Sequence, residues 1–168
     1  MTTELLEKTK ENLFNFSVDQ NDLKSILKSF PEDENVKMVT LEYEVQILKI
    51  VTVGWAINYF MEKNKDKDLL GEMFWKTVYE FSKNLSSYSS GTTGKNIDYY
   101  DILNERLNLY IDALNKLQTV SEPSKIVGHV FGEICGYKEH KDVIGIGTKV
   151  FSATILAVQA YLSSLKMI

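Results

Sequence analysis

The chain has 168 residues, of which 44% are hydrophobic and 25% charged, and its formal net charge is -4. This length fits one domain that buries about two thirds of its unfolded surface, and the composition excludes a disordered chain. Acidic and basic residues are interspersed with a slight acidic excess, so the sequence lacks the basic face that nucleic-acid binding needs.

The first 35 residues predict two short helices. Residues 4–16 place leucine and phenylalanine among acids and lysines, which is typical of an amphipathic helix. Ser17 and Gln20 have the spacing of a capping box, so a second helix is expected over residues 18–29, ended by Pro31. The acidic residues that follow are expected to face the positive end of the next helix.

Residues 36–63 predict a long helix at the centre of the fold. The segment has no proline and one glycine, and its apolar residues form two stripes. One stripe is Met38, Leu41, Val45, Leu48, Trp55 and Tyr59, and the other is Val39, Tyr43, Ile47, Ile50, Ile57 and Met61. A helix of this length spans roughly 42 Å at about 1.5 Å per residue. Because it must hide two faces, it is expected to lie between neighbouring helices.

The middle of the chain predicts two more helices separated by a loop. An apolar stripe indicates a helix over residues 68–87, and heptad-like spacing indicates another over residues 96–118. Between them, residues 86–95 are rich in glycine, serine and threonine. This composition predicts a mobile surface loop.

The last third predicts two further helices. Pro123 stands at a favourable first position of a helix that is expected to end at Gly136. Residues 142–166 are apolar nearly all round, which predicts a buried helix beside the one over residues 36–63. Polar residues inside both apolar stretches, such as Lys49 and Lys149, favour core helices over membrane spans.

These elements predict an all-α, single-domain bundle of about six to seven helices (1–168), with two short N-terminal helices (1–35) and a main bundle (36–168). No run of residues alternates between apolar and polar as a strand would, and no internal repeat is evident.

Three glycines spaced four residues apart form a candidate interaction surface. Gly128, Gly132 and Gly136 would leave a smooth groove on one helix face, where another backbone can approach closely. Each interior glycine costs a helix about 1 kcal/mol relative to alanine, so a compensating contact is expected. That contact is either with another chain or with a neighbouring helix of the same bundle.

Candidate catalytic and metal sites are weak. His129 and Glu133 lie four apart on one helix face, but two ligands do not make a metal site, and a surface pair explains them as well. Cys135 is placed near a helix C-terminus, where the dipole opposes a thiolate, so it is expected to be a buried apolar residue. Residues 91–95 fail the phosphate-loop pattern. No catalytic residue, cofactor or metal is therefore expected.

Aromatic residues and the sole arginine form a candidate ligand pocket. Tyr43, Trp55, Tyr59 and Tyr100 could present polar tips around an apolar ligand, with Arg106 beside them. The competing interpretation makes the aromatics core residues and Arg106 half of a surface ion pair.

The sequence thus favours a non-enzymatic protein-interaction or regulatory module that forms a homodimer, with binding of a small apolar or aromatic ligand as the alternative and a metal or hydrolytic enzyme using His129 and Glu133 as a third class. No partner among nucleic acids or membranes is expected. A single cysteine and an N-terminus without an apolar signal region favour the cytoplasm.

Overall fold

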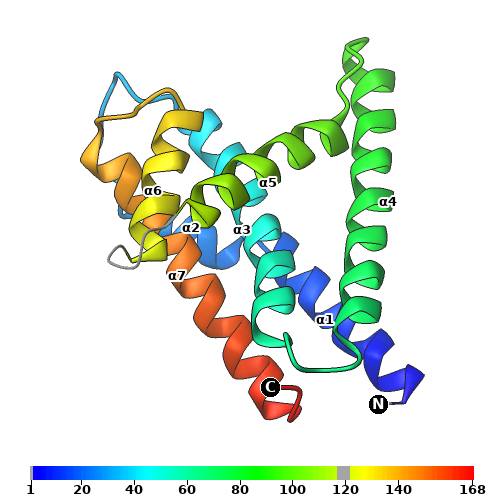
Figure 1. Ribbon diagram of the computed structural model, residues 1–168. Helices are drawn as coiled ribbons and strands as arrows, with labels where there is room; N and C mark the ends of the chain where they lie inside the picture. The colour runs from blue at the N-terminus through cyan, green and yellow to red at the C-terminus, as the bar shows by residue number, and fades with distance from the viewer. Residues whose placement is uncertain (1, 117–121) are drawn as a thin grey trace.

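The computed structural model describes residues 2–116 and 122–168 and consists, within these ranges, of helices without strands. In the described residues, seven α-helices follow one another: α1 (Thr3–Val18), α2 (Asn21–Lys28), α3 (Met38–Phe60), α4 (Lys67–Thr93), α5 (Tyr99–Asn115), α6 (Pro123–Ile134) and α7 (Lys141–Ser164). Figure 1 shows α5 crossing between α4 and the pair formed by α6 and α7. The all-α fold predicted from the sequence is confirmed.

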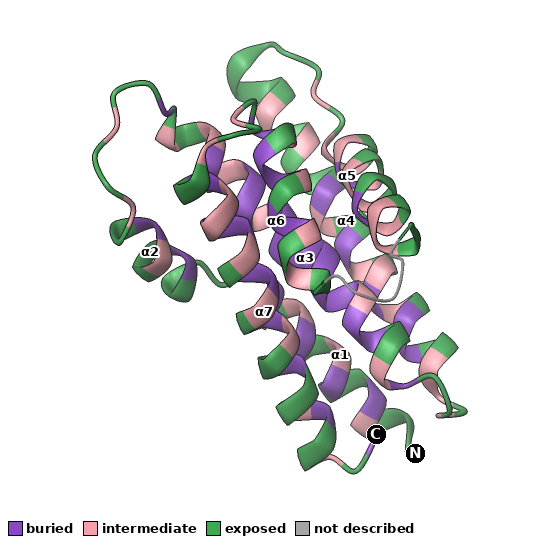
Figure 2. Cartoon of the chain, turned by 60° about the vertical axis from the view of Figure 1, so that its left-hand side comes forward, coloured by how far each residue is buried: buried purple, intermediate pink, exposed green. Residues whose placement is uncertain are grey.

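α3 is the central helix, as its two apolar stripes predict. It contacts each of the other six described helices, and its residues are buried almost continuously from Glu44 to Ile57. The buried positions in Figure 2 gather along α3 and on the faces that neighbouring helices turn toward it. Val39 and Tyr59, near the two ends of the helix, are 78% and 61% exposed, whereas Met61 at the end of the second stripe is buried.

The N-terminal helices belong to the same core, and their boundary differs from the predicted one. Leu6 and Leu13 of α1 join the hydrophobic cluster of the main bundle. The capping box is absent, because the Ser17 hydroxyl donates to the Phe14 carbonyl inside α1, and Gln20 makes no side-chain cap. The acidic residues before α3 also stay outside its first turn, which contains no acidic residue.

The expected loop over residues 86–95 is mostly helical. α4 continues to Thr93 and ends at Gly94, whose φ of 69° lies in the left-handed region that glycine tolerates. The Thr92 and Thr93 hydroxyls donate to the carbonyls of Tyr88 and Ser89, so these side chains bond within the helix. The correction has a physical reason: serine and threonine weaken a helix but do not forbid it.

α6 and α7 form a hairpin whose turn is set by glycine. Gly136 has φ of +82°, and the Tyr137 amide donates to the Gly132 carbonyl at 2.7 Å, which is the Schellman closure of a helix. α7 then packs on α6 and, as predicted, on α3.

The C-terminal helix is buried on one side only. Its other face exposes Ala153, Leu156, Ala157 and Ala160, so the expectation of a fully buried helix is corrected. Among the described helices, α7 alone has the length and apolar composition of a membrane span, and 39% of its most apolar window is buried in the fold.

Candidate binding groove

A wide concave surface of the described residues lies between α2 and the first half of α3. This α2/α3 groove has a volume of about 730 Å³ and is lined by Gln20, Leu23, Lys24, Leu27, Lys28, Met38, Val39, Glu42, Tyr43, Val45 and Gln46. Its size falls in the range of about 300 to 1,000 Å³ that binding pockets usually have. α2 lies at the edge of the bundle, as Figure 2 shows.

The groove has an apolar floor and a charged rim. Leu23 and Leu27 of α2 are buried at its base, whereas Val39 of α3 is 78% exposed beside it. Exposed side chains of both signs also line it, with Lys24 and Lys28 on α2 and Glu42 on α3. An apolar concavity edged by charges is typical of a surface that another molecule covers.

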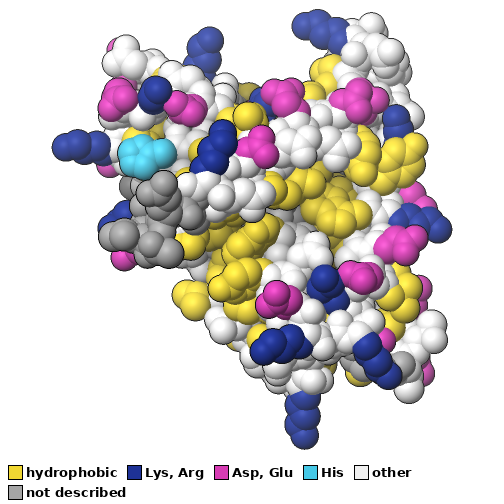
Figure 3. All heavy atoms as spheres, in the orientation of Figure 1, with side chains coloured by type: hydrophobic (Ala, Val, Ile, Leu, Met, Phe, Trp, Pro, Cys, Tyr) yellow, Lys and Arg dark blue, Asp and Glu magenta, His cyan; other side chains and the backbone are white. Residues whose placement is uncertain are grey.

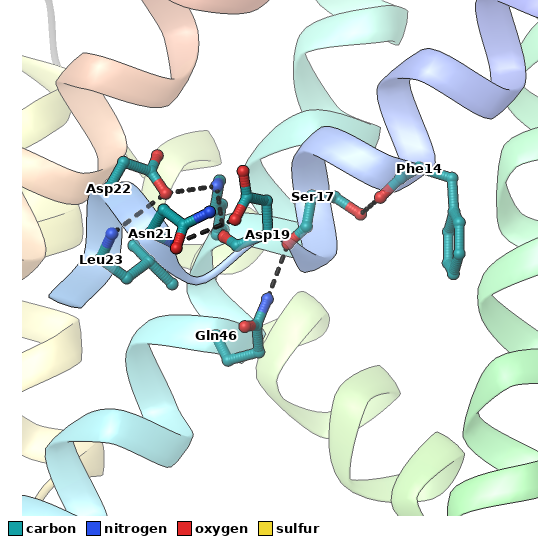
Figure 4. Close-up of polar contacts among 8 residues, drawn as sticks. Phe14, Ser17, Asp19, Asn21, Asp22, Leu23 and Gln46 are labelled. Carbon is teal, nitrogen blue, oxygen red and sulfur yellow. Dashed lines mark hydrogen bonds and ion pairs between the residues drawn. The ribbon is translucent and has the colours of Figure 1, made fainter.

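A buried lysine fixes the N-terminal end of α2. The Lys49 side chain of α3 is fully buried, and its Nζ donates to the Asp19 carbonyl and to Asp22 Oδ1, both at 2.8 Å. The same Nζ lies 4.3 Å from the centre of the Phe16 ring. Figure 4 shows Asp19 and Asp22 at this turn between α1 and α2, with Gln46 bonded to the Ser17 backbone. These contacts hold α2 at one end.

The loop after α2 is fixed at its other end by the hairpin of α6 and α7. His140 Nε2 lies 3.0 Å from Asp33 Oδ2, and this hydrogen bond, together with those from Asn35, lowers the pKa of the Asp33 carboxyl. The Lys37 amide donates to the Tyr137 hydroxyl at 2.8 Å. Polar contacts therefore hold the N-terminal end of α2 and the loop that leads from α2 to α3.

A second polar cluster lies within the core, behind the N-terminal half of α3. Arg106 of α5 donates from Nε and Nη2 to the Glu44 carboxylate at 3.0 Å, and the two side chains are 18% and 5% exposed. Burial and the Glu44 charge raise the pKa of the Cys135 thiol to about 12, so this thiol stays protonated at neutral pH. The cluster links α3 to α5 and has the geometry of a structural ion pair.

Gly128 and Gly132 of the glycine row face α7 and the turn that precedes it. A Cβ on Gly128 would collide with the Thr148 hydroxyl and lie 2.7 Å from the Ile144 carbonyl oxygen, and one on Gly132 would lie 3.0 Å from the Ile144 side chain. α7 therefore occupies the row, and Gly136 serves the turn. Gly128 and Gly132 thus make the close contact within the bundle that the sequence left open as one of two alternatives.

The predicted aromatic pocket is not assembled. Tyr43 lines the α2/α3 groove, whereas Trp55 stacks on Tyr59 at 4.7 Å, one half of α3 further along. Tyr100 packs edge-on against Tyr79 at 4.8 Å, and Arg106 is engaged by Glu44. Tyr43 and Trp55 line different pockets of the described residues and lie about 18 Å apart along α3, so the structure does not bring the five residues together around one ligand.

The remaining candidates lie apart from the groove. His129 is exposed, and Glu133 pairs with Lys138 at 2.9 Å. Within the described residues, no group of three or more His, Cys, Asp or Glu side chains is placed to hold a metal ion. Residues 91–95 lie at the C-terminal end of α4, where the helix dipole is unfavourable for phosphate.

Comparisons with protein-family models, with curated proteins and with solved structures find no match for this chain. The protein is therefore described by its structure alone, as an all-α bundle with an open apolar groove at its edge. Sequence reasoning missed the groove. The sequence signal for it lies in α2, where Leu23 and Leu27 are four residues apart and therefore share a helix face, and each is followed by a lysine.

Proposed function

We propose that this protein is a non-enzymatic interaction module that pairs with a second copy of itself through the α2/α3 groove. The observation that carries the proposal is the open apolar groove with Val39 exposed beside it. Covering the groove would remove apolar surface from water, which is the main favourable term in protein association. Because polar contacts already hold the start of α2 and the loop after it, less conformational freedom would be lost on binding.

The charges along the groove favour a second copy as the occupant. In a twofold dimer the same surface meets itself, so it must be complementary to itself in shape and charge. The groove carries Lys24 and Lys28 on one wall and Glu42 on the other. A twofold pairing would bring the lysines of each copy toward the glutamate of its partner, and would place Val39 of each copy over the apolar floor of the other.

Two other apolar surfaces are weaker candidates for the same role. Figure 3 shows hydrophobic side chains at the surface below α5, on the face flanked by α4 and α7. The exposed face of α7 carries alanines around Leu156, which is 65% exposed. The α2/α3 groove differs from the α7 face because it combines a concave apolar floor with charges of both signs, and such complementarity fixes register.

A charge-reversal series tests the proposal by sedimentation velocity over a wide concentration range. We expect the wild type to dimerise, and Lys24→Glu with Lys28→Glu to weaken the dimer about tenfold or more, because like charges would then face each other. Adding Glu42→Lys to that variant reverses both walls and should restore most of the affinity.

The matched control changes the net charge by the same amount outside the groove. Lys63 and Lys65 are exposed in the turn between α3 and α4, so Lys63→Glu with Lys65→Glu should leave dimerisation unchanged. A wild type that remains monomeric at every concentration would overturn the proposal. So would a combined reversal that fails to recover affinity although it folds like the wild type.

A further inference from the structure

The loop between α2 and α3 (residues 29–37) lies beside the turn between α6 and α7, as Figure 1 shows. Asp33 of this loop is bonded to His140 of the turn, with 3.0 Å between Oδ2 and Nε2. The Lys37 amide donates to the Tyr137 hydroxyl at 2.8 Å. On the basis of the dimer proposed above, we propose that these two hydrogen bonds form a latch, through which the α6–α7 turn controls the position of α2 and hence dimerisation through the α2/α3 groove.

The latch is the polar connection between the loop and the hairpin of α6 and α7. Among the described residues, the other hydrogen bonds of residues 29–37 stay within the loop or join it to an adjoining helix. Asn35, for example, donates from its backbone and its side chain to Asp33 Oδ1. The Phe30 ring also faces the turn, with its centre 5.9 Å from that of the His140 ring. Contacts from both ends of the loop therefore meet on the same turn.

The bond between Asp33 and His140 has a charged acceptor. Hydrogen bonds from His140 and Asn35 lower the pKa of the Asp33 carboxyl, so this group is ionised at neutral pH. An ionised carboxylate can only accept hydrogen bonds, so His140 Nε2 is the donor. Such bonds are about twice as strong as those between neutral groups. Alanine at either position removes this bond, because no other residue outside the loop donates to Asp33 among the described residues.

The backbone of the hairpin fixes the turn side of the latch. Gly136, with φ of +82°, ends α6, and the next amide, that of Tyr137, donates to the Gly132 carbonyl. His140 is the N-cap of α7, and its carbonyl accepts from the Ile144 amide at 3.0 Å. Both latch residues of the turn therefore have places that are set by the packed pair of α6 and α7. Neither of them lines the groove, so they act as positioning residues.

α2 depends on what holds the chain before and after it. It has eight residues, and a helix this short is not stable by itself in water. Lys49 anchors its start, and the latch holds the loop that follows its end. Leu27 and Lys28, which line the groove, lie at that end of α2. Without the latch, this part of the wall would have more freedom to lose on binding, which weakens a dimer.

A double-mutant cycle followed by sedimentation velocity tests the latch. We expect Asp33→Ala and His140→Ala each to weaken the dimer about tenfold, because each removes a hydrogen bond to a charged group. Since both changes remove the same bond, the double variant should be about as weak as either single variant. Tyr137→Phe keeps the ring but loses the acceptor for the Lys37 amide, so it should also weaken the dimer.

The matched control removes another ion pair of the same hairpin. Glu133 and Lys138 form an exposed pair at 2.9 Å that belongs neither to the latch nor to the groove lining. Glu133→Ala with Lys138→Ala should therefore leave dimerisation unchanged. The proposal is overturned if Asp33→Ala and His140→Ala dimerise with wild-type affinity, or if their losses simply add in the double variant.

Hydrogen exchange in dilute solution tests the latch in the monomer and so separates it from the dimer. In His140→Ala, we expect the hydrogen-bonded amides of Asn35, Val36 and Lys37 to exchange about tenfold faster, with α6 unchanged. The His140 and Asp33 side chains are 24% and 30% exposed, so the variant is expected to fold. Unchanged exchange in the loop would overturn the latch. Faster exchange with a wild type that stays monomeric would overturn the dimer, and with it the role of the latch in dimerisation.

Discussion

Replacing Arg106 by methionine is expected to lower the free energy of unfolding by about 3 to 5 kcal/mol, which is the usual cost of removing one partner of a buried ion pair. Glu44 would stay in the core, where only 5% of its side chain is exposed, without its two hydrogen-bond donors. Its carboxylate would then be buried without a counter-charge. Urea unfolding followed by circular dichroism measures the loss.

Two further variants show whether the loss comes from the unpaired charge. Glu44→Met with Arg106→Met removes both partners and should recover most of the stability, since an apolar pair of similar volume fits a buried site. Lys83 and Asp98 form an exposed pair at 3.4 Å, so Lys83→Met should cost no more than about 1 kcal/mol. An Arg106→Met variant as stable as Lys83→Met would contradict this account of the cluster.

Replacing Gly128 by alanine is expected to destabilise the fold by about 1 to 3 kcal/mol, the typical cost of overpacking a core. The added methyl would meet the Thr148 hydroxyl and lie 2.7 Å from the backbone oxygen of Ile144. A flexible side chain could move aside, but the backbone of α7 cannot move without opening the hairpin of α6 and α7. Thermal melts of the variant and the wild type measure the effect.

Gly145 provides the matched control on the facing helix. It lies within α7. Apart from its two chain neighbours and the backbone of its own helix, no atom of the described residues lies within 4 Å of a Cβ placed on it. Gly145→Ala should therefore stabilise the protein by about 0.5 to 1 kcal/mol, because alanine favours the helix. If Gly128→Ala and Gly145→Ala change the stability in the same direction, the close packing of Gly128 against α7 does not explain the effect, and this account of the glycine row is wrong.

The architecture could be predicted where apolar periodicity is strong. α3 shows two stripes over more than six turns, and only a central helix can bury both. Predictions failed where they rested on local composition. The end of α4 contains residues typical of loops, but its side chains bond within the helix as far as Gly94. Composition alone cannot distinguish these two uses of serine and threonine.

The sites were harder to predict than the helices, because a site depends on distances between elements. Tyr43 and Trp55 belong to neighbouring stripes of α3, yet twelve residues of helix separate them by about 18 Å. Arg106 stood out as the sole arginine, but its buried partner Glu44 lies 62 positions away in the chain. The α2/α3 groove depends on how far α2 stands from α3, and no residue pattern encodes that distance.

Hydrogen exchange at low and high protein concentration tests the central claim most directly, because it locates the surface that becomes covered. The account predicts that exchange slows with concentration in residues 20–28 and 38–46, which form the two walls of the groove. Amides on the exposed face of α7, around Leu156, should exchange at the same rate at both concentrations. Concentration-dependent protection on α7 with none along α2 and α3 would contradict the claim, as would no protection on either surface.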